Sequence, residues 1–431
     1  MVDIAPLRPL RYDPSVLPAV VAPPYDVIDA ALRAQLAARD PHNVVHIDLP
    51  EGEGQARYDH ARALFEAWQR QGVLVRDAER AYFRYAQDFT PPGGGDSIER
   101  RGFFAAVRAT PFNERKVLPH ELTLKGPKLD RLELGRATRA ALSPQFMLYP
   151  DPGHALEAHL DAGEPFAAFT TDDGVRHRLW RITDDSSIAH ITHALAARTL
   201  LIADGHHRYE TAVALAQEIE RSAPAHDASA EHLFTPALLV NEDDPSLVVY
   251  PTHRLVHSLA RFDFERLLER AGELFDVQRV SGDSAALVAR LSAARGKAVC
   301  AVVPGGRAAL LVRRDDADLA GHPVLGARPD VLRDTAVVLL HDALLQHILG
   351  ITPVAQAARE NLTYVQDPHE GIAMLERGDG QVLFLMNPTP VSVIRRVAEA
   401  GETMPQKSTF FYPKVPTGLF FHTLHPDRHL T

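Results

Sequence analysis

One segment of the chain combines the residue types that bind phosphate groups. It reads ADGHHRYETA, residues 203–212, and it follows a short apolar run that predicts a buried strand. Asp204 and Gly205 form a tight turn, and Gly205 lets a ligand approach the backbone closely. Apolar residues spaced three and four apart then predict a helix. A strand, a glycine turn and a helix in this order favour an anion site, because a helix start offers unpaired N–H groups and the positive end of its dipole.

Three basic side chains lie on the first turn of that helix, those of His206, His207 and Arg208. An arginine can grip phosphate oxygens with two parallel hydrogen bonds. Cations at this end of a helix oppose the helix dipole at a cost of about 0.3 kcal/mol or more each. Because a bound anion would offset that cost, we predict that this turn binds phosphate. The alternative is that Asp204 is a plain N-cap and that the histidines are solvated.

A second segment, HELTLKGPKLDR at residues 120–131, is polar and has few apolar anchors. Phosphoryl transfer needs cations on the travelling group and a carboxylate that orients the nucleophile or holds Mg²⁺. The segment offers both kinds of side chain: His120, Glu121, Thr123, Lys125, Lys128, Asp130 and Arg131. The alternative is a solvated loop with local ion pairs.

A third segment, MPQKSTFFYPKVPTG at residues 404–418, combines lysines and hydroxyls with aromatic residues. Its Lys-Ser-Thr run is similar to the end of a P-loop, but the upstream glycines of that motif are missing. We predict a lid or phosphate clamp, with a plain terminal strand as the alternative. A lid would place the Lys407 ammonium within one side-chain length of the 206–208 turn. The candidate ligands in this segment are Lys407, Ser408, Thr409 and Lys414.

Near the N-terminus, APPYDVI at residues 22–28 sets a rigid turn through its two prolines. The turn presents Tyr25 and Asp26, which are either structural or in contact with a substrate. The chain has neither an HExxH motif nor paired cysteines, so we expect no dedicated zinc site. Mg²⁺ that arrives with a nucleotide would need only one or two carboxylates.

The helix-start segment resembles the phosphate boxes of known families. GHHRYETA, residues 205–212, is similar to the Gly-Cys-His-Arg-Tyr segment of sulfiredoxins and to the Gly-Glu-Arg-Arg-Trp/Tyr-Arg-Ala box of ParB-type CTP-binding proteins. It also looks like the Asp-Gly-His/Asn-His-Arg box of a free-serine kinase of archaea. In those folds the box opens a helix and holds nucleotide phosphates. The working cysteine of sulfiredoxins falls on His206 here, which excludes thiol-based sulfinic acid repair.

The whole chain resembles an uncharacterised prokaryotic family, domain-of-unknown-function family 1015. Five motifs in order carry this resemblance: APPYDVI (22–28), NVVHIDLP (43–50), HELTLKGPKLDR (120–131), ADGHHRYETA (203–212) and MPQKSTFFYPKVPTGL (404–419). The family itself names no reaction.

Composition narrows the other classes of function. The chain has 431 residues, of which 45% are hydrophobic and 24% are charged, as in a globular protein. Its formal charge of −10 disfavours a nucleic-acid partner, which would need a basic face. Neither a signal core nor an apolar run of about eighteen residues occurs, so we expect a cytoplasmic protein without a membrane partner. The single cysteine, Cys300, lies in an apolar run and is expected in a buried strand.

Strands interleaved with helices predict an α/β protein with a mixed sheet. We expect a ParB/sulfiredoxin-like nucleotide-binding module at residues 105–255, with an N-terminal α/β segment at 1–104, an α/β insertion at 256–330 and a C-terminal segment at 331–431 that completes the site. Among single elements, apolar spacing predicts helices at 30–39 and 331–349 and strands at 145–149 and 382–386.

Together these patterns and resemblances predict a nucleotide-dependent phosphotransferase, a small-molecule kinase. The resemblance implies that it acts on serine or a similar hydroxylated metabolite. The phosphates would lie on Gly205 and the 206–208 turn, with His207 also taking part in the transfer. Asp204 would hold Mg²⁺ or the acceptor hydroxyl. In the free-serine kinase an upstream glutamate is the base, and the resemblance implies that role, together with a share of Mg²⁺, for Glu121. Lys125 and Lys407 would stabilise the developing charge.

The remaining expectations concern ligands and partners. Substrate contacts are expected from Tyr25, Asp26, His120, Thr123, Asp130, Arg131 and Lys414. The resemblance favours ATP or ADP and allows CTP. The alternatives are a nucleotide-binding switch or slow NTPase of ParB-like type, and a phosphatase or lyase that acts on a phosphorylated metabolite. The sequence allows a homodimer.

Overall fold

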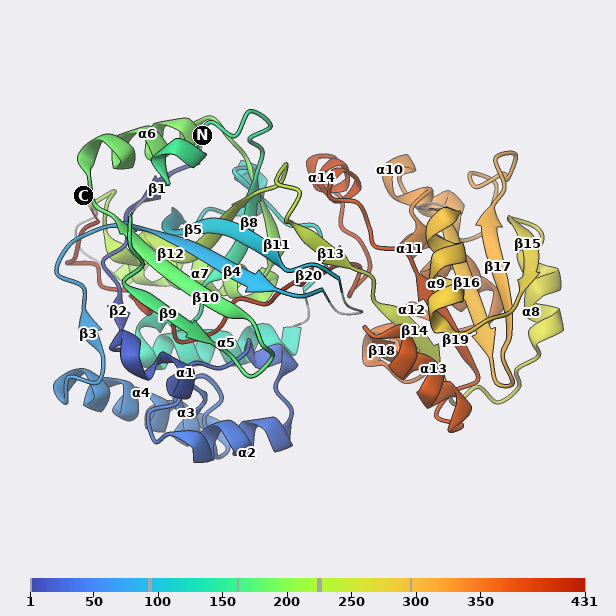
Figure 1. Ribbon diagram of the computed structural model, residues 1–431, viewed down its shortest axis with the longest axis horizontal. Helices are drawn as coiled ribbons and strands as arrows, with labels where there is room; N and C mark the ends of the chain where they lie inside the picture. The colour runs from blue at the N-terminus through green and yellow to red at the C-terminus, as the bar shows by residue number, and fades with distance from the viewer. Residues whose placement is uncertain are drawn as a thin grey trace. The chain divides into compact units, whose positions relative to one another are not determined.

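The computed structural model describes residues 2–91, 95–123, 125–160, 163–222, 227–294 and 297–430. The chain divides into two compact units, whose elements are labelled in Figure 1. Unit 1 comprises Met1–Pro119, Thr123–Leu247 and Pro413–Thr431, and unit 2 comprises His120–Leu122 and Val248–Tyr412. The chain crosses between the units inside two of the five motifs, HELTLKGPKLDR and MPQKSTFFYPKVPTGL.

Unit 1 is built around a mixed sheet that has nine strands among its described residues. The strand order is β6-β11-β8-β12-β5-β4-β10-β9, and β1 pairs with β5 off this path. β8 runs parallel to β12 and β6 runs parallel to β11, whereas the other pairs are antiparallel. The strands are β1 (Ile4–Ala5), β4 (Tyr82–Phe89), β5 (Ile98–Arg108), β6 (Val117–Leu118), β8 (Gln145–Tyr149), β9 (Ala167–Thr170), β10 (Arg176–Ile182), β11 (Leu200–Asp204) and β12 (Phe234–Asn241).

Helices cover both sides of this sheet. In Figure 1, α6 lies on one side, and α2, α3 and α4 lie on the other. α5 packs against both α4 and α7. The helices are α1 (Leu17–Val20), α2 (Ala30–Arg39), α3 (Val45–Asp48), α4 (Gly54–Arg70), α5 (Lys125–Thr138), α6 (Asp185–Ala196) and α7 (His206–Ser222), with short 3-10 turns such as η2 (Tyr25–Val27). Two small ribbons complete the unit, β2 (Leu10–Arg11) with β3 (Val75–Arg76) and β7 (Ala140–Ala141) with β21 (His422–Thr423).

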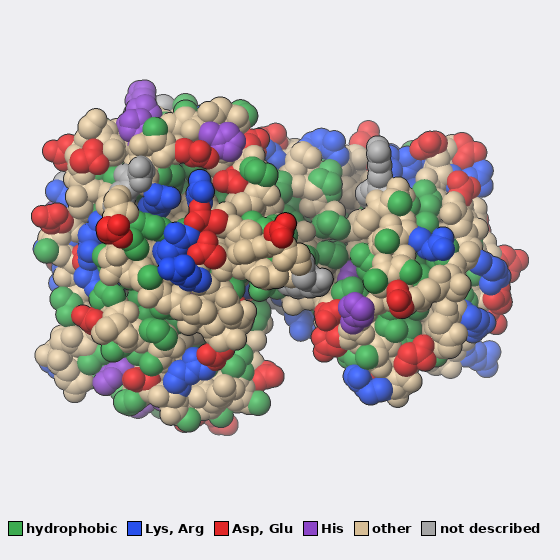
Figure 2. All heavy atoms as spheres, in the orientation of Figure 1, with side chains coloured by type: hydrophobic (Ala, Val, Ile, Leu, Met, Phe, Trp, Pro, Cys, Tyr) green, Lys and Arg blue, Asp and Glu red, His purple; other side chains and the backbone are tan. Residues whose placement is uncertain are grey.

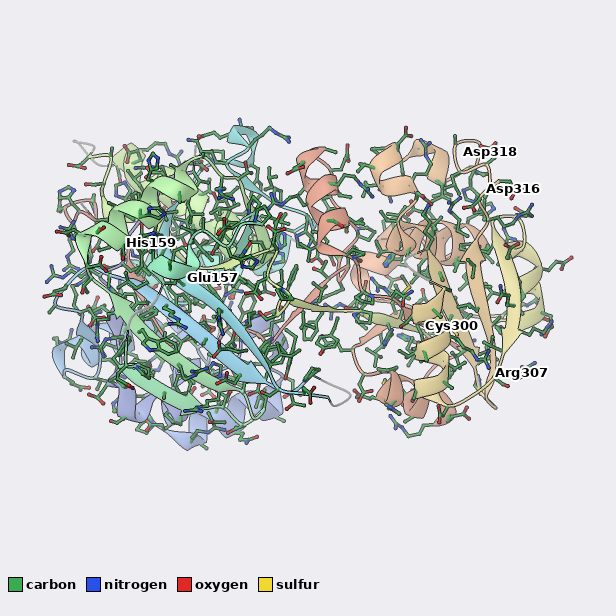
Figure 3. The ribbon with its side chains drawn as sticks, turned by 45° about the horizontal axis from the view of Figure 1, so that its top comes forward. Glu157, His159, Cys300, Arg307, Asp316 and Asp318 are labelled. Atoms are coloured by element: carbon green, nitrogen blue, oxygen red, sulfur yellow. The ribbon has the colours of Figure 1, made fainter. Side chains whose placement is uncertain are left out.

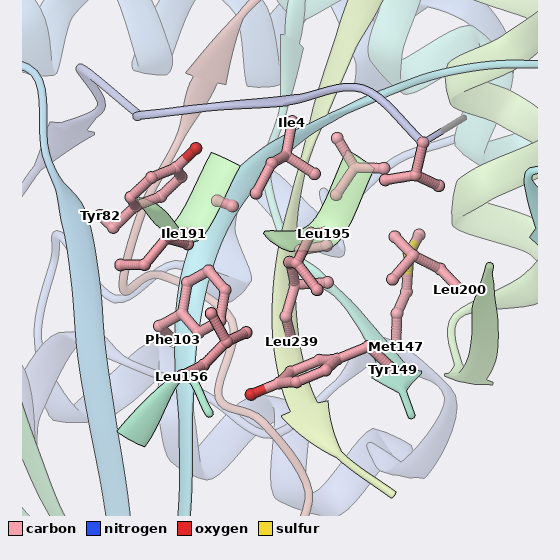
Figure 4. Close-up of a cluster of buried hydrophobic side chains, with 14 of the residues drawn as sticks. Ile4, Tyr82, Phe103, Met147, Tyr149, Leu156, Ile191, Leu195, Leu200 and Leu239 are labelled. Carbon is pink, nitrogen blue, oxygen red and sulfur yellow. The ribbon is translucent and has the colours of Figure 1, made fainter. Parts of the chain in front are cut away.

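The main core of unit 1 lies between α6 and the sheet. Ile191 and Leu195 of α6 pack with Phe103, Met147 and Leu239 of the strands, and all five side chains are buried (Figure 4). Alternate residues of each strand point to this face, so the apolar alternation of the sequence builds the core directly.

Unit 2 is built around an antiparallel sheet with the strand order β15-β17-β16-β19-β14-β18. Leu287, Leu291 and Leu375 of two helices, α9 and α13, pack on one face of it. The strands are β14 (His253–Val256), β15 (Phe275–Val280), β16 (Ala298–Val303), β17 (Arg307–Arg313), β18 (Leu362–Val365) and β19 (Val382–Met386), and a separate ribbon pairs β13 (Val248–Tyr250) with β20 (Phe410–Tyr412). The helices are α8 (Phe264–Ala271), α9 (Ser284–Ala293), α10 (Asp330–Arg333), α11 (Ala336–Val338), the π-helix η7 (Leu339–Ile348), α12 (Pro353–Ala358), α13 (Pro368–Glu376) and α14 (Val391–Glu399).

The predicted mixed α/β class is confirmed, as are the helix at 30–39 and the strands at 145–149 and 382–386. Cys300 is buried in β16 as predicted, and burial raises the pKa of its thiol to about 12 (Figure 3). Among the described residues, no helix is long and apolar enough to cross a membrane.

Two expectations differ from the structure. The long helix predicted at 331–349 is wrong: it is broken into α10, α11 and η7, because the Thr335 hydroxyl accepts a hydrogen bond from the Val338 N–H and starts a new helix there. The boundary expected between residues 104 and 105 falls inside β5, which continues to Arg108. The ParB/sulfiredoxin-like character of residues 105–255 stays a prediction.

Candidate functional site

The predicted strand, glycine turn and helix are present in unit 1. β11 ends at Asp204, α7 begins at His206, and Gly205 between them has a φ of +93°. A Cβ added to Gly205 would lie 2.9 Å from Arg208 Nε. Glycine is therefore required at this position for its backbone conformation and for the space that the arginine occupies. The N-terminal turn of α7 carries the predicted basic residues.

Arg208 turns back from α7 and ties the junction together. Its Nη2 donates to Asp204 Oδ2 at 2.5 Å, and its Nη1 donates to Ser143 Oγ at 3.2 Å and to the Pro144 carbonyl. The side chain is only 9% exposed. These contacts make Arg208 an anchor of the strand–helix junction, and its predicted role as a phosphate ligand stays a prediction.

Lys414 brings the last motif to the same carboxylate. Its Nζ donates to Asp204 Oδ1, across 210 residues of sequence. Asp204 therefore binds an arginine through one carboxylate oxygen and a lysine through the other. The predicted phosphate box and the predicted substrate contact Lys414 meet at this residue.

A second cluster in unit 1 is centred on Arg131, in the middle of α5. The buried guanidinium forms ion pairs with Asp48 at 2.9 Å and with Asp130 at 2.6 Å, and its Cζ lies 4.4 Å from the centre of the Tyr25 ring. Asp130 also accepts hydrogen bonds from Arg57 and from Tyr58 of α4. Three of the five motifs meet here, and residues 125–131 form helix, not the alternative solvated loop.

Arginines of both clusters act on the same titratable groups. Burial raises the pKa of Tyr25 to about 12, although the positive charges of Arg208 and Arg131 oppose that shift. Burial also raises the pKa of Asp48 against the same two arginines. A cavity of about 50 Å³ is lined by the charged residues Asp48, Arg131 and Arg208 together with uncharged polar and apolar residues. This space suits a few water molecules and is too small for a nucleotide.

Glu210, one turn into α7, ties the phosphate box to the second motif. Thr123 Oγ1 donates to Glu210 Oε1 at 2.8 Å, and Lys128 Nζ forms an ion pair with the other oxygen. Neither Glu210 nor Asp48 was among the predicted site residues. The signal for Asp48 was present in the sequence, because a single carboxylate inside the apolar run VVHIDL needs a buried partner.

The other predicted residues come together in unit 2. His120 Nε2 and Thr409 Oγ1 share a hydrogen bond of 2.9 Å, and the Glu121 carboxylate accepts one from the Lys407 backbone N–H. The Ser408 hydroxyl donates to the Pro405 carbonyl. The first residues of HELTLKGPKLDR and the first half of MPQKSTFFYPKVPTGL thus form one local structure.

The model of a family described as Protein of unknown function (DUF1015) matches residues 4–334, which is more than half of the chain. The chain belongs to the DUF1015 family. The match includes four of the five motifs, and both clusters of unit 1 draw on residues inside it.

Several solved structures are weakly similar to this DUF1015 protein. They include a conserved hypothetical protein from Pyrococcus furiosus (13% identity, 74% of this chain and 94% of that chain, TM-score 0.36), a free serine kinase in complex with AMP (11%, 74% and 92%, 0.37) and SbnI with a C-terminal truncation from Staphylococcus aureus (10%, 74% and 87%, 0.38). At these TM-scores the likeness carries no argument about activity. No curated protein matches the chain.

The remaining predicted residues of this DUF1015 protein are placed as follows. His206 is buried and His207 is half-buried, so the alternative of solvated histidines is wrong for His206. Asp26 is exposed on η2. The side chain of Lys125 lies outside the described part of the chain. The predicted approach of Lys407 to the 206–208 turn stays a prediction, because the two segments belong to different units.

Mg²⁺ does not fit the residues predicted to hold it. The two oxygens of Asp204 are each bound by a cationic side chain, which leaves little negative charge for a metal ion. Glu121 accepts a backbone N–H instead. Within the described ranges, no group of three His, Cys, Asp or Glu side chains is arranged around a metal position. We therefore assign no reaction step to Mg²⁺.

Proposed function

We propose that this DUF1015 protein binds a nucleotide through its phosphates at the first turn of α7 and transfers a phosphoryl group to a small hydroxylated metabolite. One observation carries the proposal. Lys414, from the far end of the sequence, places its ammonium on Asp204 at the start of α7, next to the Gly205 turn. A lysine ammonium and a helix N-terminus at one point form an electrostatic site for an anion.

The contacts of Asp204 divide the roles of the two cations. Arg208 is held by Ser143 and the Pro144 carbonyl as well as by Asp204, so it stays in place when a ligand binds. Lys414 has a flexible stem and is 18% exposed, so a phosphate can compete with Asp204 for its ammonium. We infer that Lys414 binds the phosphate, and that Arg208 keeps Asp204 oriented.

Release of Lys414 would also prepare Asp204 for chemistry. Asp204 Oδ1 can then accept a hydrogen bond from the hydroxyl group of an acceptor molecule and hold its oxygen near the phosphate. In the transfer, the bond from the terminal phosphorus to the bridging oxygen of the nucleotide breaks, and a bond from that phosphorus to the acceptor oxygen forms. The acceptor proton passes to a carboxylate, for which Glu121 stays the predicted base.

A nucleotide-binding switch without transfer is the second candidate. It is favoured by the contacts of Asp204, because a carboxylate that keeps both of its cationic partners offers no place for the Mg²⁺ that normally accompanies phosphoryl transfer, so the transferase requires the release of Lys414 and the switch does not.

The predicted partners and location stay proposals as well. Acidic and basic side chains are intermixed on the face drawn in Figure 2. We propose a small-molecule substrate, a homodimer and a cytoplasmic location, with neither nucleic acid nor a membrane as partner.

A panel of ligands tests the proposal directly. ATP, ADP, CTP, GTP and pyrophosphate are each added with and without Mg²⁺, and thermal unfolding is recorded. A ligand at 100 times its dissociation constant should stabilise the protein by about 2.7 kcal/mol. Phosphorus NMR with serine and other hydroxylated metabolites then separates the transferase from the switch. The absence of any thermal shift would remove nucleotide binding and both candidates with it.

A further inference from the structure

Two deeply buried arginines hold the last motif by its backbone. Arg100 in unit 1 and Arg254 in unit 2 are each only 1% exposed. Arg100 Nη2 donates to the Pro413 carbonyl at 2.7 Å, and Arg254 Nη2 donates to the Lys407 carbonyl at 3.0 Å. Each unit thus uses one buried guanidinium to fix its own part of MPQKSTFFYPKVPTGL.

In unit 1, the contact fixes the peptide next to Lys414. The Arg100 guanidinium lies over the Phe146 ring, with 4.6 Å between Cζ and the ring centre, and also donates to Gln87 Oε1. Gln87 Nε2 in turn donates to the Lys414 carbonyl at 3.0 Å. The carbonyls of Pro413 and Lys414 are therefore both held by hydrogen bonds. The ammonium at the end of the Lys414 side chain binds Asp204.

In unit 2, the contact fixes the backbone of Lys407. Arg254 Nε donates to His341 Nε2 at 3.2 Å, and His341 belongs to the π-helix η7. Arg254 holds the Lys407 carbonyl, and the Glu121 carboxylate holds its N–H. Lys407 has a φ of +57°, a left-handed conformation that costs a residue other than glycine about 1–2 kcal/mol. Such strain persists where the surroundings fix the residue, and it clusters at functional sites.

Stability of the fold does not by itself account for these arginines. Burial lowers the pKa of each guanidinium to about 10, which shows how unfavourable the positive charge is in these positions. Two nitrogens of Arg100, Nε and Nη1, have no hydrogen-bond partner among the described residues. Replacement of a buried charged network by apolar residues of similar volume is often neutral for stability.

The lysines that they hold are scarce in this chain. Its six lysines are Lys116, Lys125, Lys128, Lys297, Lys407 and Lys414, against forty arginines. Four of the six lie in two of the five motifs. Lysine carries a compact charge on a flexible stem, and arginine does not replace it where a point charge must move to a ligand.

We propose that Arg100 and Arg254 are positioning residues, which fix the backbone of the last motif so that the ammonium groups of Lys414 and Lys407 are held in defined places. For Lys414, the ligand that this ammonium meets is the phosphate of the proposed function, on which that part of the inference rests.

A measurement without ligand tests the positioning itself. Lysine acetylation by a small amine-reactive reagent is followed at each site by mass spectrometry. In Arg100→Met, Lys414 should react about tenfold faster, because the loss of one net hydrogen bond frees the backbone of the last motif. Lys116 of the same unit should keep its rate. In Arg254→Met, Lys407 should react faster and Lys297 should not. Folded variants in which Lys414 and Lys407 keep their rates would overturn the inference. If Arg100→Met does not fold, Gln87→Met removes only the contact to the Lys414 carbonyl and takes its place.

A double-mutant cycle tests whether Arg100 acts through Lys414. Arg100→Met should weaken pyrophosphate binding about tenfold in the wild-type background and leave it unchanged in Lys414→Gln. An equal loss in both backgrounds would show that Arg100 acts independently of Lys414. A wild-type protein that binds neither pyrophosphate nor any nucleotide would remove the proposed function, whereas the acetylation rates would still decide the positioning.

Discussion

Each unit contains a carboxylate held between an arginine and a lysine, but the two triads are built differently. In unit 1, Asp204 lies between Arg208 and Lys414. In unit 2, Asp334 lies between Lys297 and Arg313, with 2.7 Å from Arg313 Nε to Asp334 Oδ1. The Asp204 and Lys414 side chains are 17% and 18% exposed, whereas those of Asp334 and Lys297 are 38% and 47% exposed.

The difference shows that residue types alone do not make a site. The unit 2 triad borders a cavity of about 850 Å³, yet its residues lie outside the five motifs, and its lysine is largely solvated. Ion pairs with side chains as exposed as these contribute little to the free energy of unfolding. The unit 1 triad joins two motifs more than two hundred residues apart, and its lysine is carried by a peptide that Arg100 and Gln87 hold. The two triads contain the same types of charged residue. They differ in the buried hydrogen bonds that hold the backbone of the lysine in unit 1.

The largest expected effect concerns the predicted base, which lies in unit 2. Glu121→Gln should keep nucleotide affinity and lower the rate of phosphoryl transfer by about 10²–10⁴-fold, the usual contribution of a general base. The amide oxygen can still accept the Lys407 N–H, so the local structure is kept. Transfer at the wild-type rate would remove Glu121 from the chemistry, and a wild type that transfers nothing would favour the switch.

Breaking the unit 1 junction should cost stability. Gly205→Ala should lower the free energy of unfolding by about 2–3 kcal/mol, because its φ is positive and the new Cβ meets the Arg208 guanidinium. Gly305→Ala in unit 2 is the matched control, since its φ is +81° and the space around it is open. Urea titrations of both variants should show the smaller loss, about 1–2 kcal/mol, for Gly305→Ala. Equal losses would mean that the arginine gives way easily.

The comparison of the triads is sharpened by one pair of lysine variants. Lys414→Gln should weaken pyrophosphate binding by about ten- to a hundredfold, the value of a charged hydrogen bond. Lys297→Gln should leave it unchanged. Isothermal titration measures the affinity of both variants. A loss of affinity as large in Lys297→Gln as in Lys414→Gln would show that the unit 1 triad alone does not form the anion site.

The last expected effect is a dependence of stability on pH. Burial, with a further contribution from Arg100, lowers the pKa of His177 to about 3. The unfolded chain titrates near pH 6.5, so below that value it binds a proton that the folded chain does not. Stability therefore falls as the pH drops from about 6.5 towards about 3, by at most about 1.4 kcal/mol per pH unit for this group.

His177→Gln tests this by removing the titration while keeping a polar side chain for Tyr85 and Thr171. Thermal unfolding of the variant should depend less on pH between about pH 6.5 and 4.5 than that of the wild type. His60→Gln, at an exposed position of α4, should retain the wild-type dependence. A slope unchanged by His177→Gln would mean that other groups set it.

Much of the fold and part of the site could be predicted from local patterns. The spacing of apolar residues after Gly205 located α7, and the burial of His206 excludes a solvated side chain at that position. The run around Cys300 located β16. Such predictions succeed because a helix or strand is decided by neighbours within a few residues.

The partners of the charged residues could not be predicted in this way. Nothing near Arg208 indicates Ser143 and Pro144, and nothing near Arg131 indicates Asp48, which lies 83 residues earlier. Arg254 stood as a lone charge in an apolar strand, which signals a buried partner without naming it. The division of HELTLKGPKLDR between the two units was equally invisible.

The sequence by itself determined the α/β class, the strand–glycine–helix junction at 200–222 and the five motifs in which polar residues gather. Only the tertiary structure decided that Asp204 is shared by Arg208 and Lys414, that Mg²⁺ has no ready place there, and that two buried arginines hold the last motif. The physical reason is the separation along the chain of the groups that interact. Backbone conformation follows from steric and hydrogen-bonding preferences along a few residues, whereas an ion pair or a buried hydrogen bond joins groups that only the packing of distant segments brings together.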